Sequence, residues 1–295
     1  QVSGTTNWLR GISFGNGSFL AVGENGTIIS SGNAVNWAAQ GSGTAFSLND
    51  ITFNNGTFVA VGGGGTLLSQ AVILTSSSFQ FWEPREIENV GSLESVAFNN
   101  GSFVSIGIGG RIITSTDTVE WTDQIRGTTA WLLGTEFLNN RFFAVGLSGT
   151  LLASANGKTW SILDSGISGS LSDLALGNGR FVAIGGSGNL TTSAGGLEWT
   201  AANTGTNANL NSIAFGNQIF VAVGNGSIIQ TSMNGGDWMT VQAADSPSSL
   251  EGVIFGNGRF VAVGRGNFAT GNTNRSIMTS TDGINWTEHD HNGNG

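Results

Sequence analysis

The sequence contains no cysteine, so the fold is built without disulfide bonds and the composition does not fix a redox compartment. Lysine occurs once, at Lys158, and 10 basic residues stand against 19 acidic ones, giving a net charge of −9. Because nucleic-acid binding depends on clustered Lys and Arg, we expect no nucleic-acid partner. The same shortage argues against an anionic membrane surface as a partner.

Long apolar runs and helical periodicity are also missing. No run reaches the roughly 18 residues needed to cross a bilayer, so we expect no membrane insertion. Glycine, in contrast, accounts for 48 of the 295 residues. The glycines follow no triplet period, and many stand beside Asn at fixed places along the chain, which indicates turns that need positive φ rather than a disordered tract.

A segment of the type Gly-Arg-Phe-Val-Ala-Val-Gly occurs seven times with a period of about 40 residues. A Trp follows each copy and precedes the next Phe by 21 or 22 residues. The marker residues are Phe19, Phe58, Phe103, Phe142, Phe181, Phe220 and Phe260, together with Trp37, Trp82, Trp121, Trp160, Trp199, Trp238 and Trp286. A fixed period of this length indicates a solenoid, an array or a propeller.

One repeat contains four short strand patterns separated by turn residues. In the sixth repeat they cover 210–215, 219–223, 227–232 and 237–241. Four antiparallel strands repeated seven times predict an all-β, seven-bladed β-propeller that forms one domain over 1–290, with 291–295 as a tail. The expected blades are 7–45, 46–90, 91–129, 130–168, 169–207, 208–247 and 248–290.

The first strand of each repeat alternates large and small side chains. Ile213 and Phe215 share one face, whereas Ser212 and Ala214 share the other. We expect the bulky face of one blade to pack on the small face of its neighbour. The seven framework Trp residues are interpreted as core.

The third hairpin of the repeat has a recurrent sequence that runs from Ser to Trp, as in Ser280-Thr281-Asp282-Gly283-Ile284-Asn285-Trp286. It resembles the Asp-box hairpin of the BNR-repeat propellers, which include sialidases, sortilin-like receptors and photosystem II assembly factors. Asp stands in the box at 117 and 282, and Asn at 33, 156 and 234; here the box is one residue shorter than is usual. In such boxes the Asp or Asn caps its own turn, so the resemblance implies an architecture rather than an activity.

The resemblance also implies which activities to test for. Sialidases of this family use a tyrosine nucleophile and an arginine triad, but this chain has no Tyr and its nine Arg show no placement that suggests a triad. The assembly factors carry a basic patch, which an acidic chain with one Lys does not match. The remaining expectation is a bacterial surface propeller that binds glycans or proteins.

Departures from the repeat are the best pointers to a site, because packing does not require them. The segment from the Gly that ends strand 2 to the box Ser spans 8 residues in five blades, but 14 in blade 2 and 16 in blade 7. The residue before strand 1 is polar in five blades and is Trp8 or Trp131 in the other two. Strand-1 starts and 2–3 loops emerge on one face and the boxes on the other, so Trp8 is expected between two elongated loops.

The expected ligand-binding residues therefore centre on blades 7, 1 and 2. They are Trp8, Arg10, Asn49, Asp50, Glu251, Arg265, Asn267, Phe268 and Arg275. An aromatic platform among Arg, Asn and carboxylates suits a sugar or an extended peptide. The alternative interpretation is neutral loop growth, with Trp8 covering a blade junction.

Catalysis is the competing function. Asp50 and Glu251, or Glu94, Glu136 and Asp173 near the inner strands, could serve acid/base hydrolysis in a glycoside hydrolase or polysaccharide lyase. Such carboxylates also solvate a channel mouth, which is the interpretation we adopt. His289-Asp290-His291 is interpreted as a solvated tail; we expect no metal and no cofactor.

The sequence thus predicts a non-catalytic binding or adhesion propeller with a glycan or a surface protein as its partner. A structural subunit of a larger surface assembly is a further alternative. The start at Gln1, without an initiator Met, fits a processed secreted protein but also a trimmed sequence. We expect a secreted or cell-surface location, with the periplasm as the alternative. Residues 1–6 are expected to lie beside the last strand of blade 7.

Overall fold

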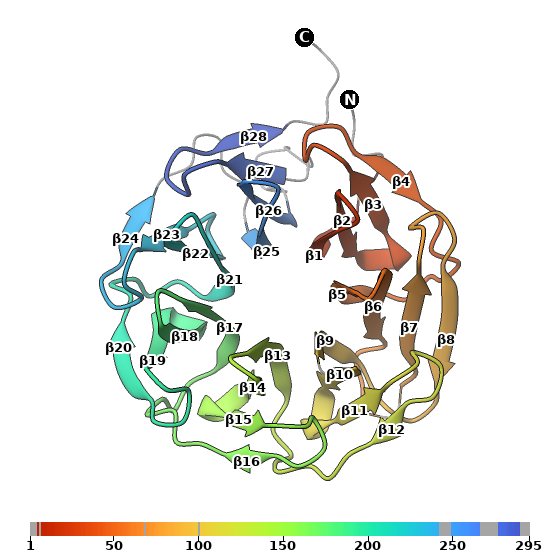
Figure 1. Ribbon diagram of the computed structural model, residues 1–295, viewed down its shortest axis with the longest axis horizontal. Helices are drawn as coiled ribbons and strands as arrows, with labels where there is room; N and C mark the ends of the chain where they lie inside the picture. The colour runs from red at the N-terminus through yellow and green to blue at the C-terminus, as the bar shows by residue number, and fades with distance from the viewer. Residues whose placement is uncertain are drawn as a thin grey trace.

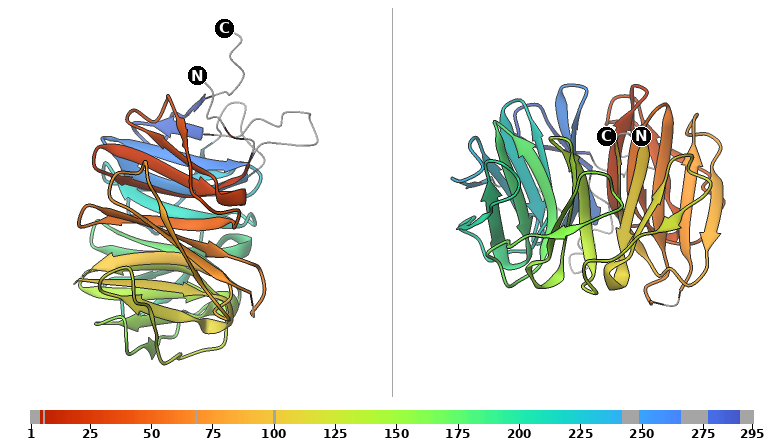
Figure 2. Two further views of the ribbon diagram at one scale, coloured as in Figure 1. Left: turned by 90° about the vertical axis from the view of Figure 1, so that its right-hand side faces the viewer. Right: turned by 60° about the horizontal axis from the view of Figure 1, so that its bottom comes forward.

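The computed structural model describes residue 5 and residues 7–67, 69–99, 101–241, 249–265 and 277–289. Seven four-stranded antiparallel sheets are arranged as blades around a central axis (Figure 1), which confirms the predicted seven-bladed β-propeller. In each blade the strands lie in sequence order, with the first innermost and the fourth at the rim. Side views show that the strands run between the two faces of the disc (Figure 2).

The strands of blades 1 to 4 have the following bounds: β1 (Leu9–Gly15), β2 (Ser18–Gly23), β3 (Ile28–Ser31), β4 (Ala38–Gln40), β5 (Leu48–Asn54), β6 (Thr57–Gly63), β7 (Ala71–Ser76), β8 (Glu83–Ile87), β9 (Leu93–Asn99), β10 (Ser102–Gly107), β11 (Ile112–Ser115), β12 (Thr122–Asp123), β13 (Leu132–Leu138), β14 (Arg141–Gly146), β15 (Leu151–Ser154) and β16 (Ser161–Ile162). Those of blades 5 to 7 are β17 (Leu171–Gly177), β18 (Arg180–Gly185), β19 (Asn189–Ser193), β20 (Thr200–Asn203), β21 (Leu210–Gly216), β22 (Ile219–Gly224), β23 (Ile229–Ser232), β24 (Met239–Val241), β25 (Ser249–Gly256), β26 (Arg259–Arg265), β27 (Ile277–Ser280) and β28 (Thr287–His289). Short 3-10 turns join strands 2 and 3 in four blades: η1 (Glu24–Gly26), η2 (Ile108–Gly110), η3 (Leu147–Gly149) and η4 (Gly186–Gly188).

The hairpin turns have the chemistry that their sequences predict. Between β1 and β2, Asn16 and Gly17 adopt φ of 47° and 72°. Two successive residues with positive φ give a turn whose twist matches that of the flanking strands, and Asn-Gly is its preferred sequence. Strand 2 then reads Phe-Leu-Ala-Val and is buried throughout, as its uninterrupted apolar sequence indicates.

The hydrophobic core is divided among the seven interfaces between blades. Each of the seven buried clusters in the described residues takes its members from two neighbouring blades. Large side chains of one blade meet small positions of the next, as the alternation in strand 1 predicts: a Cβ built on Gly15 would lie 2.1 Å from the ring of Phe53. No blade therefore completes a core by itself.

The ring closes without a shared strand in the described part of the chain. Blade 7 consists of the consecutive strands β25 to β28, and blade 1 of β1 to β4. Val261, Val263 and Ile277 of blade 7 pack with Leu9 and Ile12 of blade 1. The expected strand-like pairing of residues 1–6 falls almost entirely outside the described residues.

The Ser-to-Trp hairpins are held by their own side chains. In blade 1, Asn33 Oδ1 accepts hydrogen bonds from the backbone N–H groups of Val35 and Asn36, at 3.0 and 2.9 Å. The indole of Trp37 donates to the carbonyl of Ala34, three residues earlier, at 3.1 Å. All seven framework Trp residues make this indole bond. Each is either a buried member of a core cluster or a partly buried residue that packs against one.

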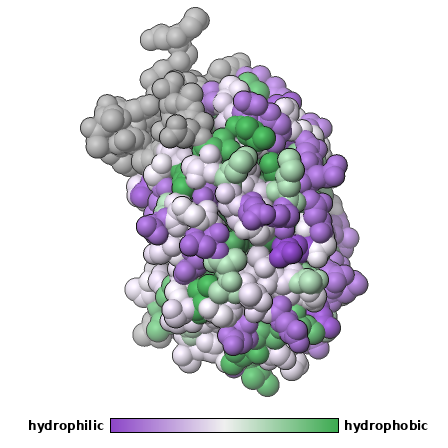
Figure 3. Space-filling model, turned by 90° about the vertical axis from the view of Figure 1, so that its left-hand side faces the viewer, coloured by the Kyte–Doolittle hydropathy of each residue, from purple (hydrophilic) through white to green (hydrophobic). Residues whose placement is uncertain are grey.

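The two faces of the disc differ in what they display. We call the face formed by the strand-1 starts and the 2–3 loops the mouth face, and the one formed by the 1–2 turns and the Ser-to-Trp hairpins the hairpin face. The backbone N–H of Glu24, in a 2–3 loop, donates to the carbonyl of Trp8, just before β1, which places these segments together. At the rim near β20 and β24, small apolar patches alternate with polar surface (Figure 3), the normal appearance of a protein exterior.

Candidate functional site

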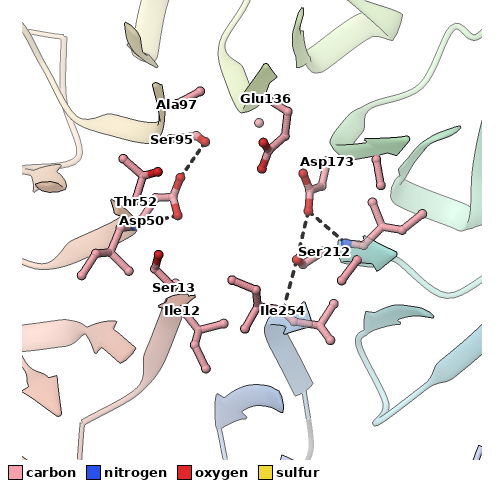
Figure 4. A pocket seen from close by; sticks show the side chains of 18 of the residues that line it. Ile12, Ser13, Asp50, Thr52, Ser95, Ala97, Glu136, Asp173, Ser212 and Ile254 are labelled. Atoms are coloured by element: carbon pink, nitrogen blue, oxygen red, sulfur yellow. Dashed lines mark hydrogen bonds between the residues drawn. The ribbon is translucent and has the colours of Figure 1, made fainter. Parts of the chain in front are cut away.

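The inner strands of all seven blades line a cavity of about 510 Å³ along the propeller axis. Its wall is polar, because five carboxyl groups and one guanidinium contribute to it. The charged residues are Arg10, Asp50, Glu94, Glu136, Asp173 and Glu251. Figure 4 shows the carboxyl groups of Asp50, Glu136 and Asp173 turned into this channel.

A β-bulge in each first strand determines which residues reach the mouth of the channel. In every blade the pairing of strands 1 and 2 skips one residue next to the first Leu of strand 1. We call the seven skipped residues the mouth ring: Arg10, Asn49, Glu94, Leu133, Ser172, Asn211 and Glu251. All seven line the cavity. Bulges re-aim side chains and are common beside binding sites.

The Gly that ends strand 2 makes this geometry possible. A Cβ at Gly23 would lie 1.8 Å from the carbonyl oxygen of Trp8, and one at Gly146 would lie 2.2 Å from that of Trp131. Only glycine permits so close an approach of the two backbones. The recurrent Gly of the sequence motif is thus explained by the backbone path that leads into the bulge.

On the side of blades 7 and 1, the mouth is built from ion pairs and a stacked tryptophan. Arg10 Nη2 lies 3.0 Å from Glu24 Oε1, and Arg10 Nη1 lies 3.5 Å from Asn49 Oδ1. The guanidinium carbon of Arg265 lies 4.4 Å from the ring centroid of Trp8, which is a cation–π contact. Arg265 also approaches Glu251, with 3.9 Å between Nε and Oε1.

Hydrogen bonds continue this network around the ring. Asn211 Nδ2 donates to Glu251 Oε2 at 3.1 Å, and Ser249 Oγ donates to Glu251 Oε1 at 2.8 Å. Asn49 Nδ2 donates to the carbonyl of Leu93 in the next blade at 2.9 Å. The polar side chains at the mouth are therefore fixed in place before any ligand arrives.

The structure brings most of the sequence-predicted site residues together. Trp8, Arg10, Asn49, Glu251 and Arg265 meet at the mouth, and Asp50 lies one residue deeper in the channel. Asn267, Phe268 and Arg275 lie outside the described residues. Of the remaining mouth-ring residues, the sequence analysis named Glu94 only as a possible acid/base group, and it missed Leu133, Ser172 and Asn211.

The elongated loop of blade 2 lies elsewhere than expected. Part of the extra length extends β6 and β7, whose pairing continues to Gly63 and Ala71. The loop then leans on blade 3: the N–H of Gly91 donates to the carbonyl of Ser69, and a Cβ on Gly109 would lie 2.6 Å from the side chain of Leu67. Its contacts are thus on the side away from blade 1, so Trp8 is not framed by this loop.

Two aspartates connect neighbouring blades inside the channel. Asp50 Oδ2 accepts hydrogen bonds from Ser95 Oγ and the Val96 N–H of blade 3, at 2.7 and 2.9 Å. Asp173 repeats the arrangement with Ser212 and Ile213 of blade 6, both at 2.9 Å (Figure 4). Burial raises the pKa of both carboxyls, that of Asp173 to about 7, although these hydrogen bonds favour the charged form.

Glu136, in blade 4, lies across the channel from blades 7 and 1 (Figure 4). The Glu136 side chain is exposed to the channel, and the inner strands surround the channel on all sides. Burial, followed by the charges of Asp173 and Asp50, raises its pKa well above the ordinary value. The centre of the channel therefore carries less negative charge at neutral pH than the number of carboxyl groups would suggest.

Metal ligands and membrane-spanning helices are two further features that bear on function. Among the described residues, no group of three His, Cys, Asp or Glu side chains is placed to hold a metal ion. The interpretation of His289 as part of a solvated tail is wrong, because His289 belongs to β28 and its Nε2 lies 2.8 Å from Thr279 Oγ1. Asp290 and His291 lie outside the described residues. The described part of the chain also contains no helix with the length and apolar character of a membrane span.

No family model and no curated protein matches the chain. Solved structures do match. The structure of YCF48 bound to D1 peptide shares 16% identity with a TM-score of 0.68, covering 90% of this chain and 91% of that one. YCF48 from Cyanidioschyzon merolae shares 19% identity with a TM-score of 0.59, over 82% and 84%. The WD40 propeller domain of Doa1 shares 16% identity with a TM-score of 0.67, over 89% and 91%.

At these identities the similarity concerns the fold alone. It does not distinguish the BNR-repeat propellers from other propeller families, so the Asp-box relationship stays a resemblance of local sequence and local hydrogen bonding. The chain is a seven-bladed β-propeller, similar in architecture to YCF48 and to WD40 propellers.

Proposed function

We propose that this protein is a non-catalytic binding propeller that holds a polypeptide partner at the mouth of its channel. The observation that carries the proposal is the mouth ring. One repeated bulge presents seven side chains of five residue types at equivalent points around a single opening. Such a ring has the regular backbone of a scaffold and the irregular side chains of a recognition surface.

The hydrogen bonding of the carboxylates supports binding rather than hydrolysis. Asp50 uses both oxygens as acceptors, for Ile51 on one and for Ser95 and Val96 on the other. Glu251 likewise holds Ser249 and Asn211 with its two oxygens. Groups committed in this way position neighbouring strands, whereas a general acid or base must reach substrate atoms.

A polypeptide is favoured over a glycan because one face of the Trp8 indole is already covered. The Arg265 guanidinium already covers one face of the indole, the kind of surface on which a sugar ring would stack. The YCF48 structure with a bound D1 peptide offers an example of a propeller of similar fold with a peptide ligand. A secreted or cell-surface location is part of the proposal, and cell fractionation with surface proteolysis would test it.

The experiment compares a bulky substitution in the mouth ring with the same kind of substitution on the hairpin face. Ser172→Trp adds bulk to the mouth ring, and Lys158→Trp adds it to an exposed hairpin-face position. Each variant is applied to a displayed random-peptide library, a glycan array and a panel of polysaccharides. We expect peptide binding by the native protein and by Lys158→Trp, and about tenfold weaker binding by Ser172→Trp. Glycan binding that is lost only in Ser172→Trp would replace the polypeptide by a glycan, and released reducing ends would establish an enzyme.

A further inference from the structure

Blade 4 differs from the other six blades at the mouth face. Three positions of each repeat reach this region: the residue before strand 1, the mouth-ring residue and the first residue after the Gly of strand 2. In blade 4 all three are apolar, namely Trp131, Leu133 and Leu147, whereas every other blade has a polar residue or Gly in at least one of them. Trp131 and Leu147 are 38% and 39% exposed, and Leu133 lines the channel.

The backbone holds these three residues close together. The N–H of Leu147 donates to the carbonyl of Trp131 at 2.9 Å, and the bulge places Leu133 two residues further along the chain. The Trp131 side chain lies beside the Glu94 carboxyl of blade 3, whose pKa is raised by burial. At 38% exposure, part of the Trp131 surface is open to solvent.

The channel beside this patch is acidic. Five carboxylates line it against one guanidinium, that of Arg10, and this guanidinium is paired with Glu24 on the far side of the mouth. Glu94, which lies beside Trp131, belongs to the same wall. A ligand that covers the patch thus meets carboxyl groups on its channel side, with Glu94 beside the patch, and a cation placed there favours their charged form.

We propose that Trp131, Leu133 and Leu147 form the docking surface for an extended polypeptide segment in which an apolar residue adjoins a Lys or Arg. This inference rests on the proposed function and names its partner class. The apolar side chain covers the indole and the two leucines, while the basic side chain enters the channel toward Glu94. Adjacent residues of an extended chain lie about 3.3–3.6 Å apart along its axis, so one short segment reaches both features. Charge complementarity selects this occupant over an acidic or a purely apolar peptide.

The test begins with random hexapeptides displayed on beads and selected with the native protein. We expect the selected sequences to be enriched in an aromatic or aliphatic residue next to Lys or Arg. A selected peptide, labelled with fluorescein, is then titrated by anisotropy against Trp131→Ala, Leu133→Ser, Leu147→Ser and Glu94→Gln. Leu197→Ser, an exposed apolar residue on the hairpin face, is the matched control.

We expect Trp131→Ala to weaken binding at least tenfold, each of the Leu variants and Glu94→Gln several-fold, and Leu197→Ser less than twofold. Leu147→Ser changes an exposed loop residue, so it keeps the test valid if circular dichroism shows that Trp131→Ala misfolds. Selected peptides without the expected pairing, or equal binding by all patch variants, would overturn the inference. If binding instead depends on Arg10 and Trp8, the proposed function stands and this docking surface is wrong. If no peptide is selected, both are wrong.

Discussion

At the scale of single residues, the indole bond of each framework Trp requires an unusual backbone conformation. The carbonyl that accepts the indole N–H belongs to a residue with positive φ in every blade: Ala34, Phe79, Thr118, Gly157, Gly196, Gly235 and Gly283. Glycine adopts this conformation freely, but a β-branched residue is strained in it. Thr118, with φ of 65°, is therefore held there by the surrounding hairpin.

Replacing Thr118 by Gly should stabilise the protein by about 1 kcal/mol, because the left-handed strain is removed while the Trp121 bond is kept. The reverse exchange at the equivalent position, Gly283→Thr, should destabilise it. There the φ of 76° disfavours the side chain, and its Cβ would lie 2.9 Å from Val221. Urea unfolding of the two variants measures both effects; a Thr118→Gly variant less stable than the native protein would show that the threonine side chain contributes more than its strain costs.

At the scale of the element, the Ser-to-Trp hairpin shows how side chains replace missing backbone bonds. Asp282 accepts from the N–H groups of Ile284 and Asn285 at 2.8 Å each, and its pKa is lowered by these bonds and by the Asn285 side chain. Blade 5 lacks this acceptor, because Gly195 stands at the equivalent position. A Cβ at Gly195 would meet no atom within 4 Å, and its φ is not in the left-handed region.

Gly195→Asn should therefore stabilise the protein by about 1 kcal/mol, by supplying the acceptor for two backbone N–H groups and by restricting the unfolded chain. Gly195→Ala separates the two contributions, since it restricts the chain without adding an acceptor. Thermal unfolding followed by circular dichroism compares the three proteins. Equal melting temperatures for the Asn and Ala variants would mean that the acceptor contributes nothing in this hairpin.

At the scale of the whole molecule, the ring of blades creates an acidic channel that no single blade contains. Asp50, Glu136 and Asp173 come from three different blades, and burial raises the pKa of each. A carboxyl with a raised pKa binds its proton more tightly in the folded state than in the unfolded state. Its contribution to stability is complete below the unfolded pKa of about 4 and is lost as the pH rises through the folded value, about 7 for Asp173.

The protein should accordingly become less stable between about pH 4 and pH 7, and Glu136→Gln should weaken this dependence. The variant should be more stable than the native protein at pH 8 and nearly equal to it at pH 4. Glu86→Gln, on the exposed outer strand β8, is the control and should leave the pH profile unchanged. Urea midpoints across this range provide the measurement. An identical profile for Glu136→Gln would show that channel water and counter-ions neutralise the cluster.

The repeat predicted the fold because each structural role recurs seven times. The Phe-to-Gly strand, the Asn-Gly turn and the Ser-to-Trp hairpin each depend on local sequence, and the structure places them as the pattern indicates. The mouth ring was only partly predicted, because a bulge depends on the register between two strands. A signal was nevertheless present: one variable position follows the same Leu in every repeat, as at Leu9-Arg10 and Leu132-Leu133.

Other features of the site depend on tertiary contacts that the sequence does not encode locally. The stacking of Arg265 on Trp8 joins residues at the two ends of the ring. The loop of blade 2 is longer than in most blades, but its contacts with Gly91 and Gly109 determine that it packs against blade 3. Loop length therefore indicated where the repeat is broken, and the direction of the loop followed from packing.

The division of the core among the blade interfaces has a consequence for folding kinetics. An isolated blade is a set of hairpins with one half of a core on each side, so local pairing alone gains little hydrophobic stabilisation. The seam between blades 7 and 1 joins residues far apart in sequence; Arg259 Nη1 bonds to the carbonyl of Asn33 across 226 positions. Loop-closure entropy grows slowly, by about 0.6 kcal/mol for each doubling of length, but non-local contacts slow the search for the native state. Ring closure is thus the step that converts seven locally determined units into one cooperative molecule.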